Sequence, residues 1–316
     1  MSYVGGGSDI KSFYAQEPGA VLSTAIDKYM YVTLHKRFDD GLRIAYSRTE
    51  EVDDVEQILH PLVREALKKM EISGGVEITS TADIPAKGTG LGSSSSYTVG
   101  LLTALHAFKG LQVSNTKIAE MACDIEINRC GEPIGKQDQY AAAIGGLKLY
   151  EFLPDDTVTV APVIAAGEFK KQLNDETLIF YTGGTRSASN ILAEQTRNNT
   201  HSSKVRILRR MTELAHEFKR GIEFADIQYL GELLQENWSL KTRLASGITN
   251  KLIDEMYQAG IQAGARGGKL LGAGAGGFMM FIADKRRHDE ITKALAKYRA
   301  FKFSIENSGS QVIYYD

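Results

Sequence analysis

The sequence is poor in cysteine and has no long apolar run. Its two cysteines, Cys123 and Cys130, lie seven residues apart in a chain of 316 residues. Two such thiols cannot form the disulfide framework of a small secreted protein, and their spacing matches no common zinc pair. No positively charged start is followed by an apolar segment, and no run is long enough to span a bilayer. We therefore expect a cytoplasmic protein with reduced cysteines.

The sequence also lacks an excess of charge of either sign. The 37 Lys and Arg residues are balanced by 39 Asp and Glu residues, which gives a formal net charge of −2. Because acidic and basic residues interleave, the charge pattern gives no support for binding nucleic acid or a membrane surface. The six histidines show no metal-ligand spacing, and each is expected to be a surface or packing residue. We expect a small-molecule partner, with a homodimer left open.

The length and the 43% hydrophobic content allow a substantial core. Helical and strand patterns alternate without a low-complexity linker, so we expect an α+β protein of two halves, residues 1–165 and 166–316. The patterns predict a β-hairpin within 21–46, helical pieces in 52–70 with a new start at Pro61, a strand at 76–81, and a helix at 115–130 followed by a loop at 131–139. Further along, they predict strands at 147–152 and 178–182, helices over most of 187–262, and a closing β-α-β unit with strands near Phe301 and Val312.

The most informative segment is 85–96, Pro-Ala-Lys-Gly-Thr-Gly-Leu-Gly-Ser-Ser-Ser-Ser. Its three glycines at alternate positions let the backbone approach a ligand closely, and a helical pattern begins at its end. Free N–H groups at the start of a helix favour an anion. The order of strand, glycine loop and helix predicts a phosphate-binding loop.

Two other nucleotide-binding motifs fit poorly. Residues 272–277 match G-x-G-x-x-G formally, but they lead into the strand-like run 278–282, whereas the dinucleotide fingerprint opens a helix. A phosphate loop of the Walker type is missing because Leu270 follows Gly268-Lys269 where Ser or Thr is required.

Three segments together resemble the GHMP kinases, the family of galactokinase, homoserine kinase, mevalonate kinase and phosphomevalonate kinase. They are Gly-Gly-Gly-Ser-Asp at 5–9, the loop 85–96, and 269–277. The resemblance implies the GHMP kinase fold, with an N-terminal half like ribosomal protein S5 and a ferredoxin-like C-terminal half. It also implies ATP and Mg²⁺ as cofactors. The expected nucleotide-binding residues are Lys87, Gly88, Thr89, Gly90, Leu91, Gly92, Ser93, Ser94 and Ser95.

The same resemblance assigns the catalytic and metal-binding groups. Asp138 is the expected general base. Lys136 is not part of the resemblance; it lies two residues from Asp138, and we expect its cation to stabilise the ionised carboxylate in place of the Lys or Arg that many relatives carry on the first strand. Alternatively, Lys136 is a surface lysine. Ser94 and Glu126 are the expected magnesium ligands. Glu126 lies one residue further from Asp138 than the mevalonate kinase pattern gives, so the match requires an insertion in the loop between them. Alternatively, Asp138 is a turn residue and Glu126 a solvated carboxylate near a helix end.

Within the family, the segments 5–9, 20–29, 135–140 and 182–186 resemble the kinases that phosphorylate a heptose 7-phosphate at C1. A sugar that already carries a phosphate requires a cationic pocket. Arg186 is one candidate for this pocket because its planar guanidinium group suits phosphate, and Lys136 is a second candidate. Arg186 fits the start of a helix equally well. The expected acceptor-binding residues are Gly6, Gly7, Ser8, Asp9, Gln137, Gly183, Arg186 and Gly276.

Three readings of the function remain open at this point. The chain is a sugar-1-kinase, a GHMP kinase for another sugar such as fucose or for a mevalonate-type alcohol, or an inactive GHMP-fold regulator. Many relatives carry Lys or Arg on the first strand just before the position of Met1, and the first strand is expected to begin upstream of Met1. The absence of that residue gives some weight to the inactive regulator, and the presence of Asp138, Ser94 and Glu126 argues against it.

Overall fold

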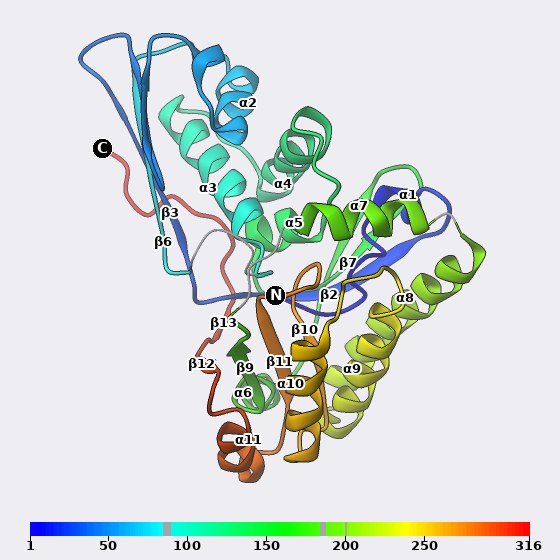
Figure 1. Cartoon of the computed structure of the whole chain (residues 1–316). Coiled ribbons are helices and arrows are strands. Elements are labelled where there is room, and N and C mark those ends of the chain that lie inside the picture. Colours follow the sequence, from blue (N-terminus) through cyan, green and yellow to red (C-terminus); the bar gives the residue numbers. More distant parts are fainter. Residues whose placement is uncertain (85–89, 184–187, 200) are drawn as a thin grey trace. The chain divides into compact units, whose positions relative to one another are not determined.

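A computed structural model of the chain describes residues 1–84, 90–183, 188–199 and 201–316 (Figure 1). The contacts divide the chain into two compact units, each formed from separate segments. Unit 1 contains 1–27, 87–91 and 146–307, and unit 2 contains 28–86, 92–145 and 308–316. Each unit is described by itself. None of the helices in the described ranges has both the length and the apolar character that a membrane span requires.

Unit 1 contains a sheet in the order β1-β2-β7-β8, with β13 also pairing with β2. All these pairs are antiparallel. The central strand β2 is buried over six successive residues, as expected for a strand with cover on both faces. The strands are β1 (Ser2–Val4), β2 (Gly19–Ile26), β7 (Leu147–Phe152), β8 (Val158–Pro162) and β13 (Ile305–Glu306).

A second sheet of unit 1 has the order β10-β11-β9-β12. Its strands are β9 (Thr177–Tyr181), β10 (Gly267–Leu270), β11 (Phe278–Ile282) and β12 (Arg299–Phe301). All five residues of β11 are buried. Side chains of Phe180, Trp238, Met279 and Phe281 belong to one core cluster with residues of the surrounding helices.

The longest two helices of unit 1, α8 and α9, pack against each other (Figure 1). The helices are α1 (Lys11–Tyr14), α6 (Gly167–Asp175), α7 (Ala188–Asn198), α8 (Ser202–Glu223), α9 (Ile227–Lys241), α10 (Lys251–Gln262) and α11 (His288–Ala294).

Since β11 and β12 both pair antiparallel with β9, they run parallel to each other. Strand β11, helix α11 and strand β12 therefore form a β-α-β unit as predicted, with β9 between the two strands, but without the strand expected near Val312.

Unit 2 contains a sheet in the order β3-β6-β4-β5. Its strands are β3 (Met30–Lys36), β4 (Leu42–Ala45), β5 (Thr49–Val52) and β6 (Val76–Ala82). The helices are α2 (Pro61–Lys69), α3 (Ser93–Phe108), α4 (Asn115–Cys123) and α5 (Gln137–Ile144), and a π-helical segment, Asp124–Arg129, continues α4. Helix α3 packs on β3 (Figure 1). Largely antiparallel sheets with helices packed on them give the predicted α+β class.

Three local predictions were wrong. The hairpin expected within 21–46 does not form, because β6 lies between β3 and β4, antiparallel to the first and parallel to the second. The loop expected at 131–139 ends early, since helix α5 begins at Gln137. Residues 311–316 form no strand, and the side chains of 312–315 are exposed, so this apolar run has no neighbouring strand to pair with.

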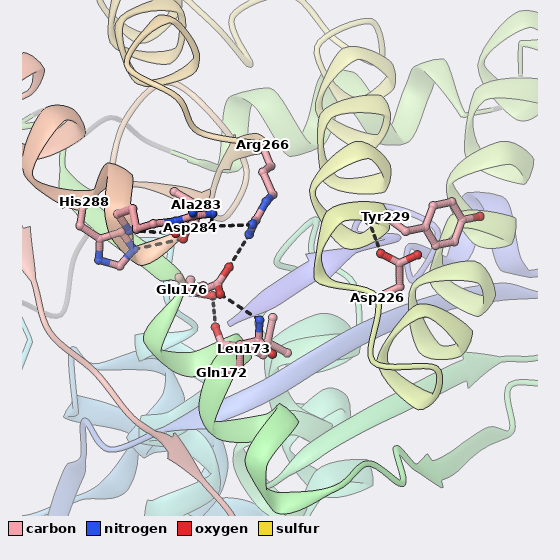
Figure 2. A network of polar contacts seen from close by, with 11 residues as sticks. Gln172, Leu173, Glu176, Asp226, Tyr229, Arg266, Ala283, Asp284 and His288 are labelled. Carbon is pink, nitrogen blue, oxygen red and sulfur yellow. Dashed lines mark hydrogen bonds and ion pairs between the residues drawn. The ribbon is translucent and has the colours of Figure 1, made fainter.

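An ion-pair network joins the ends of three neighbouring strands in unit 1 (Figure 2). Arg266 lies just before β10, and its guanidinium group contacts Glu176 at the start of β9 and Asp284 after β11. Glu176 is buried and also accepts a hydrogen bond from Gln172 of α6 at 2.9 Å. A buried carboxylate is stable only with such partners, so Arg266 stabilises the packing of this sheet.

Replacing Arg266 by Met should lower the free energy of unfolding by about 3 kcal/mol, because Glu176 would remain buried without its cation. Urea denaturation measures this. Arg286 also contacts Asp284, at 2.7 Å, but its side chain is 88% exposed. The control Arg286→Met should therefore change stability by less than about 1 kcal/mol. Equal losses in the two variants would contradict the role given to burial.

Candidate active site

The phosphate-loop sequence enters helix α3 of unit 2 through Gly92. This glycine is the N-cap of α3 with φ +71°, a left-handed conformation that favours glycine. The N–H of Ser96 closes the first turn on the Gly92 carbonyl at 2.8 Å. Ser93, Ser94 and Ser95 form the first turn, where backbone N–H groups have no acceptor within the helix. This helix start can bind an anion, as the sequence predicts, whereas Lys87, Gly88 and Thr89 lie outside the described residues.

A fully buried carboxylate, Glu126, lies beside the first turns of α3. The hydroxyl of Ser94 donates to its Oε1 at 2.9 Å, and that of Thr98 donates to the same oxygen at 2.9 Å. Its Oε2 accepts from the hydroxyl of Ser95 at 2.8 Å and from the side-chain amide of Gln139. Four donors from α3 and α5 thus bind one carboxylate, and Glu126 is not the solvated residue of the alternative interpretation.

The environment of Glu126 suits a cation. Burial raises the pKa of this carboxyl, and the hydrogen bonds from the Ser95, Thr98, Gln139 and Ser94 side chains oppose that shift. The Ser94 hydroxyl and the Glu126 carboxylate are oxygen ligands of the type that Mg²⁺ takes. Their contact brings together the two residues that the sequence assigned to the metal. The donor set therefore fits magnesium.

The backbone around Glu126 is π-helical over Asp124–Arg129. Hydrogen bonds of a π-helix span five residues instead of four, so one such turn takes up an additional residue without ending the helix. Such segments occur often at functional sites. This gives a physical reason for the spacing between Glu126 and Asp138, which is one residue longer than the mevalonate kinase pattern.

Asp138 lies in the first turn of α5 and not in a loop. A β-carbon added to Gly92 would lie 3.2 Å from Cγ and 3.4 Å from Oδ1 of Asp138, so the carboxyl group packs directly on this glycine. Lys136 is the N-cap of α5, and Gln137 is its first residue. The structure therefore brings Asp138, Gly92, Ser94 and Glu126 together within unit 2.

In unit 1, the third glycine loop contacts the described start of the phosphate loop. A β-carbon on Gly90 would lie 2.5 Å from the carbonyl oxygen of Leu271, and one on Gly272 would lie 2.4 Å from Cα of Gly90. Residues 272–277 connect β10 to antiparallel β11, so they do not open a helix. The sequence argument against a dinucleotide-binding fold is confirmed.

The end of this loop is joined to the chain segment before Gly183. The backbone N–H of Gly277 donates to the Thr182 hydroxyl at 3.0 Å, and the N–H of Thr182 donates to the Gly277 carbonyl at 2.9 Å. Gly276, which is buried, precedes this contact, and the exposed Gly183 follows it. Two of the expected acceptor-binding residues are thus neighbours, while Arg186 lies outside the described residues.

The Gly5–Asp9 segment forms a tight buried turn in unit 1. The Ser8 hydroxyl donates to the carbonyl of Gly5 at 2.9 Å and to that of Ala20 at 3.0 Å. Oδ1 of Asp9 accepts from the N–H of Gly7 at 2.9 Å. Both side chains therefore stabilise the turn itself, and Asp9 is only 2% exposed.

Helix α9 contributes two residues to this turn that the sequence analysis missed. Asn237 accepts from the N–H of Gly5 at 3.0 Å, and the Lys241 ammonium donates to the carbonyl of Gly6 at 3.2 Å. The spacing of four residues places both on one side of α9. A polar pair at this spacing on an otherwise apolar helix face is the signal that could have identified them.

Comparisons with known proteins agree with these features. Residues 58–146 match the model of the GHMP kinases N terminal domain, and residues 214–300 match that of the GHMP kinases C terminal domain. The chain belongs to the GHMP kinase superfamily and has its fold. It is therefore a kinase of the class that transfers phosphate from ATP to a small-molecule acceptor.

Among curated relatives, the D-glycero-alpha-D-manno-heptose 7-phosphate kinase of Campylobacter jejuni is 29% identical, over 98% of this chain and 95% of that protein. A mevalonate kinase of Pyrococcus horikoshii is 27% identical, over 91% of this chain and 79% of its own length. A crystal structure of a D-glycero-D-manno-heptose 1-phosphate kinase from Bacteroides thetaiotaomicron has a TM-score of 0.81 at 24% identity, covering 100% of this chain and 97% of that one.

Replacing Gly92 by Ala should lower turnover at least about tenfold, because the added methyl group displaces Asp138 from its position. ADP release in a coupled assay measures turnover. Gly110 is a matched control in the same unit, since it has φ +65° and no atom within 4 Å of an added β-carbon. Gly110→Ala should suffer the same backbone strain, about 1–2 kcal/mol, and keep its turnover. Equal activity of the two variants would contradict the contact between Gly92 and Asp138.

Proposed function

We propose that this kinase phosphorylates the anomeric C1 hydroxyl of D-glycero-D-manno-heptose 7-phosphate and forms the 1,7-bisphosphate for GDP-heptose biosynthesis. The observation that carries the kinase chemistry is the group formed by Asp138, Gly92, Ser94 and Glu126 at the start of α3. The 29% identity to a heptose 7-phosphate kinase across nearly the whole of both chains supports the choice of acceptor.

In the proposed reaction, ATP binds at residues 87–95, with phosphate oxygens facing the N–H groups at the start of α3. The acceptor hydroxyl attacks the γ-phosphorus, Asp138 accepts its proton, and the bond to the β,γ-bridging oxygen breaks, so that ADP leaves. Ser94 and Glu126 would hold Mg²⁺ through their side-chain oxygen atoms, and the ion would supply positive charge that stabilises the phosphate groups.

The remaining roles follow from the chemistry of the acceptor. Lys136 stabilises negative charge near Asp138, and Gln137 hydrogen-bonds the sugar. Arg186 binds the 7-phosphate through its planar guanidinium group, the geometry that suits phosphate. Gly6, Gly7, Ser8, Asp9, Gly183 and Gly276 complete the acceptor site. We also propose that the chain has two domains, residues 1–165 and residues 166–316.

A second candidate is a GHMP kinase with a different alcohol acceptor. The 27% identity to a mevalonate kinase over 91% of the chain favours keeping this possibility in the experiment. A protein that only regulates would not need the Ser94 hydroxyl and the buried Glu126 carboxylate at the start of α3. Their presence argues against an inactive regulator.

Coupled ADP release should be measured with heptose 7-phosphate, mannose, fucose, galactose and mevalonate at equal concentrations. We expect kcat/KM to be highest for heptose 7-phosphate, at least about a hundredfold above the unphosphorylated sugars. The reason is that a cationic site binds the 7-phosphate, which the other sugars lack. Phosphorus NMR should place the new phosphate on C1. Preference for another acceptor would contradict the proposed substrate. If no acceptor caused ADP release, the proposal that the protein is an active kinase would be wrong.

The variant Asp138→Asn should lose a factor of about 10² to 10⁴ in turnover because it cannot accept the proton. Its affinity for ATP, measured by calorimetry, should stay within about twofold of the wild type, since Asp138 acts on the acceptor. Glu120→Gln on α4 removes a half-exposed carboxylate and serves as the control with full turnover. Unimpaired turnover of Asp138→Asn would show that another group is the base.

A further inference from the structure

A buried lysine lies behind the Gly5–Asp9 turn of unit 1 and has no role in the mechanism described so far. Lys241 is the last residue of α9 and is 7% exposed. Its ammonium group donates to the carbonyl of Gly6 at 3.2 Å and to the side-chain carbonyl of Gln195 at 3.3 Å. Lysine is almost never buried to this extent unless a specific interaction requires it.

The charge that faces Lys241 is that of Asp9. Burial lowers the pKa of Lys241 to about 8, and attraction to the Asp9 carboxylate opposes this shift. The lysine is therefore still mostly protonated at pH 7. Its cation attracts the buried carboxylate of Asp9.

Gln195 of α7 connects this lysine to the glycines of the turn. Its side-chain carbonyl accepts from Lys241, and its Nε2 would lie 2.3 Å from a β-carbon on Gly7. Nε2 has no hydrogen-bond partner among the described residues, although Gln195 is fully buried. Lys241, Gln195 and Asn237 therefore contact three successive glycines, Gly7 through Gln195, Gly6 through Lys241, and Gly5 through Asn237.

We propose that Lys241 is a positioning residue for acceptor binding, which places a cation near the Asp9 carboxylate and fixes the backbone of the Gly5–Asp9 turn. The proposal rests on the acceptor-binding role proposed for Asp9. A lysine on α9 thus supplies a cation to the N-terminal glycine segment from more than 230 residues along the chain. It acts on recognition of the sugar and not on binding of ATP.

The variant Lys241→Met tests this because it removes the charge and both hydrogen bonds. We expect KM for the sugar phosphate to rise about tenfold or more, with KM for ATP within about twofold. The control is Lys251→Met on α10, whose side chain is 91% exposed. In an Asp9→Asn background, Lys241→Met should raise the acceptor KM by no more than about twofold further, because the two residues act through one carboxylate.

An independent multiplicative effect in the double variant, or an unchanged acceptor KM in the single variant, would overturn the proposal. If Lys241→Met fails to fold, Lys241→Gln is used in its place, alone and combined with Asp9→Asn, because glutamine keeps a hydrogen-bond donor. The acceptor used is whichever sugar the wild type turns over, so a wrong choice of heptose does not affect the result.

Hydrogen–deuterium exchange gives a readout that needs no substrate and so separates this proposal from the proposed function. In Lys241→Met, amides of residues 5–9 should exchange at least about tenfold faster, while those of α4 in unit 2 keep their wild-type rates. If the amides of 5–9 also keep their rates, Lys241 does not stabilise the turn, and the proposal is wrong.

Discussion

The geometry of unit 2 depends on the burial of one negative charge. The Glu126 carboxylate is removed from water, and such a group is stable only when its oxygens accept strong hydrogen bonds. Its donors come from α3 and α5, while Glu126 itself belongs to the π-helical continuation of α4. Three helical elements are thereby held at one point. Gln139 donates to Glu126, and Asp138 is its neighbour in the first turn of α5. The carboxylate proposed to hold the metal is therefore bonded to the same helical turn that carries the proposed base.

Glycine serves a second constraint, the close approach of backbone segments. Gly92 leaves space for the Asp138 carboxyl group, and Gly90 and Gly272 contact each other through their backbones. In the Gly5–Asp9 turn, Gly7 leaves space for Gln195. Each of these positions excludes a β-carbon for a different reason. The three glycine motifs are thus places where the chain packs against itself, in addition to being candidate sites for ligands.

Local patterns gave most helices and strands, because the apolar spacing of segments such as 61–69, 76–82 and 93–108 reflects their own burial. The order of strands in unit 2 could not be derived this way. Alternation in 30–36 and 42–45 predicts two strands, but nothing in it indicates that β6 pairs between them. The start of α5 was also missed, since the Gly135-Lys136 sequence is typical of a loop.

The candidate site shows the same division. Family resemblance proposed Ser94, Glu126 and Asp138, and the structure places these three residues near one another. It gave no indication of Thr98, Gln139 or Lys241, because their contacts join residues that are far apart in the sequence and leave no local pattern. The roles of all these residues stay predictions, and Arg186 and residues 87–89 also lie outside the described residues.

The division of the chain into units has a consequence for how the protein is synthesised. Strand β2, near the beginning of the chain, pairs with β13, and Ser310 contacts Thr103 of α3 at 2.8 Å. Neither unit is a continuous segment, and both need residues from 305–310. During translation, therefore, neither unit can complete its contacts until residues 305–310 have left the ribosome. A nascent chain halted before that point exposes incomplete surfaces of both units to chaperones.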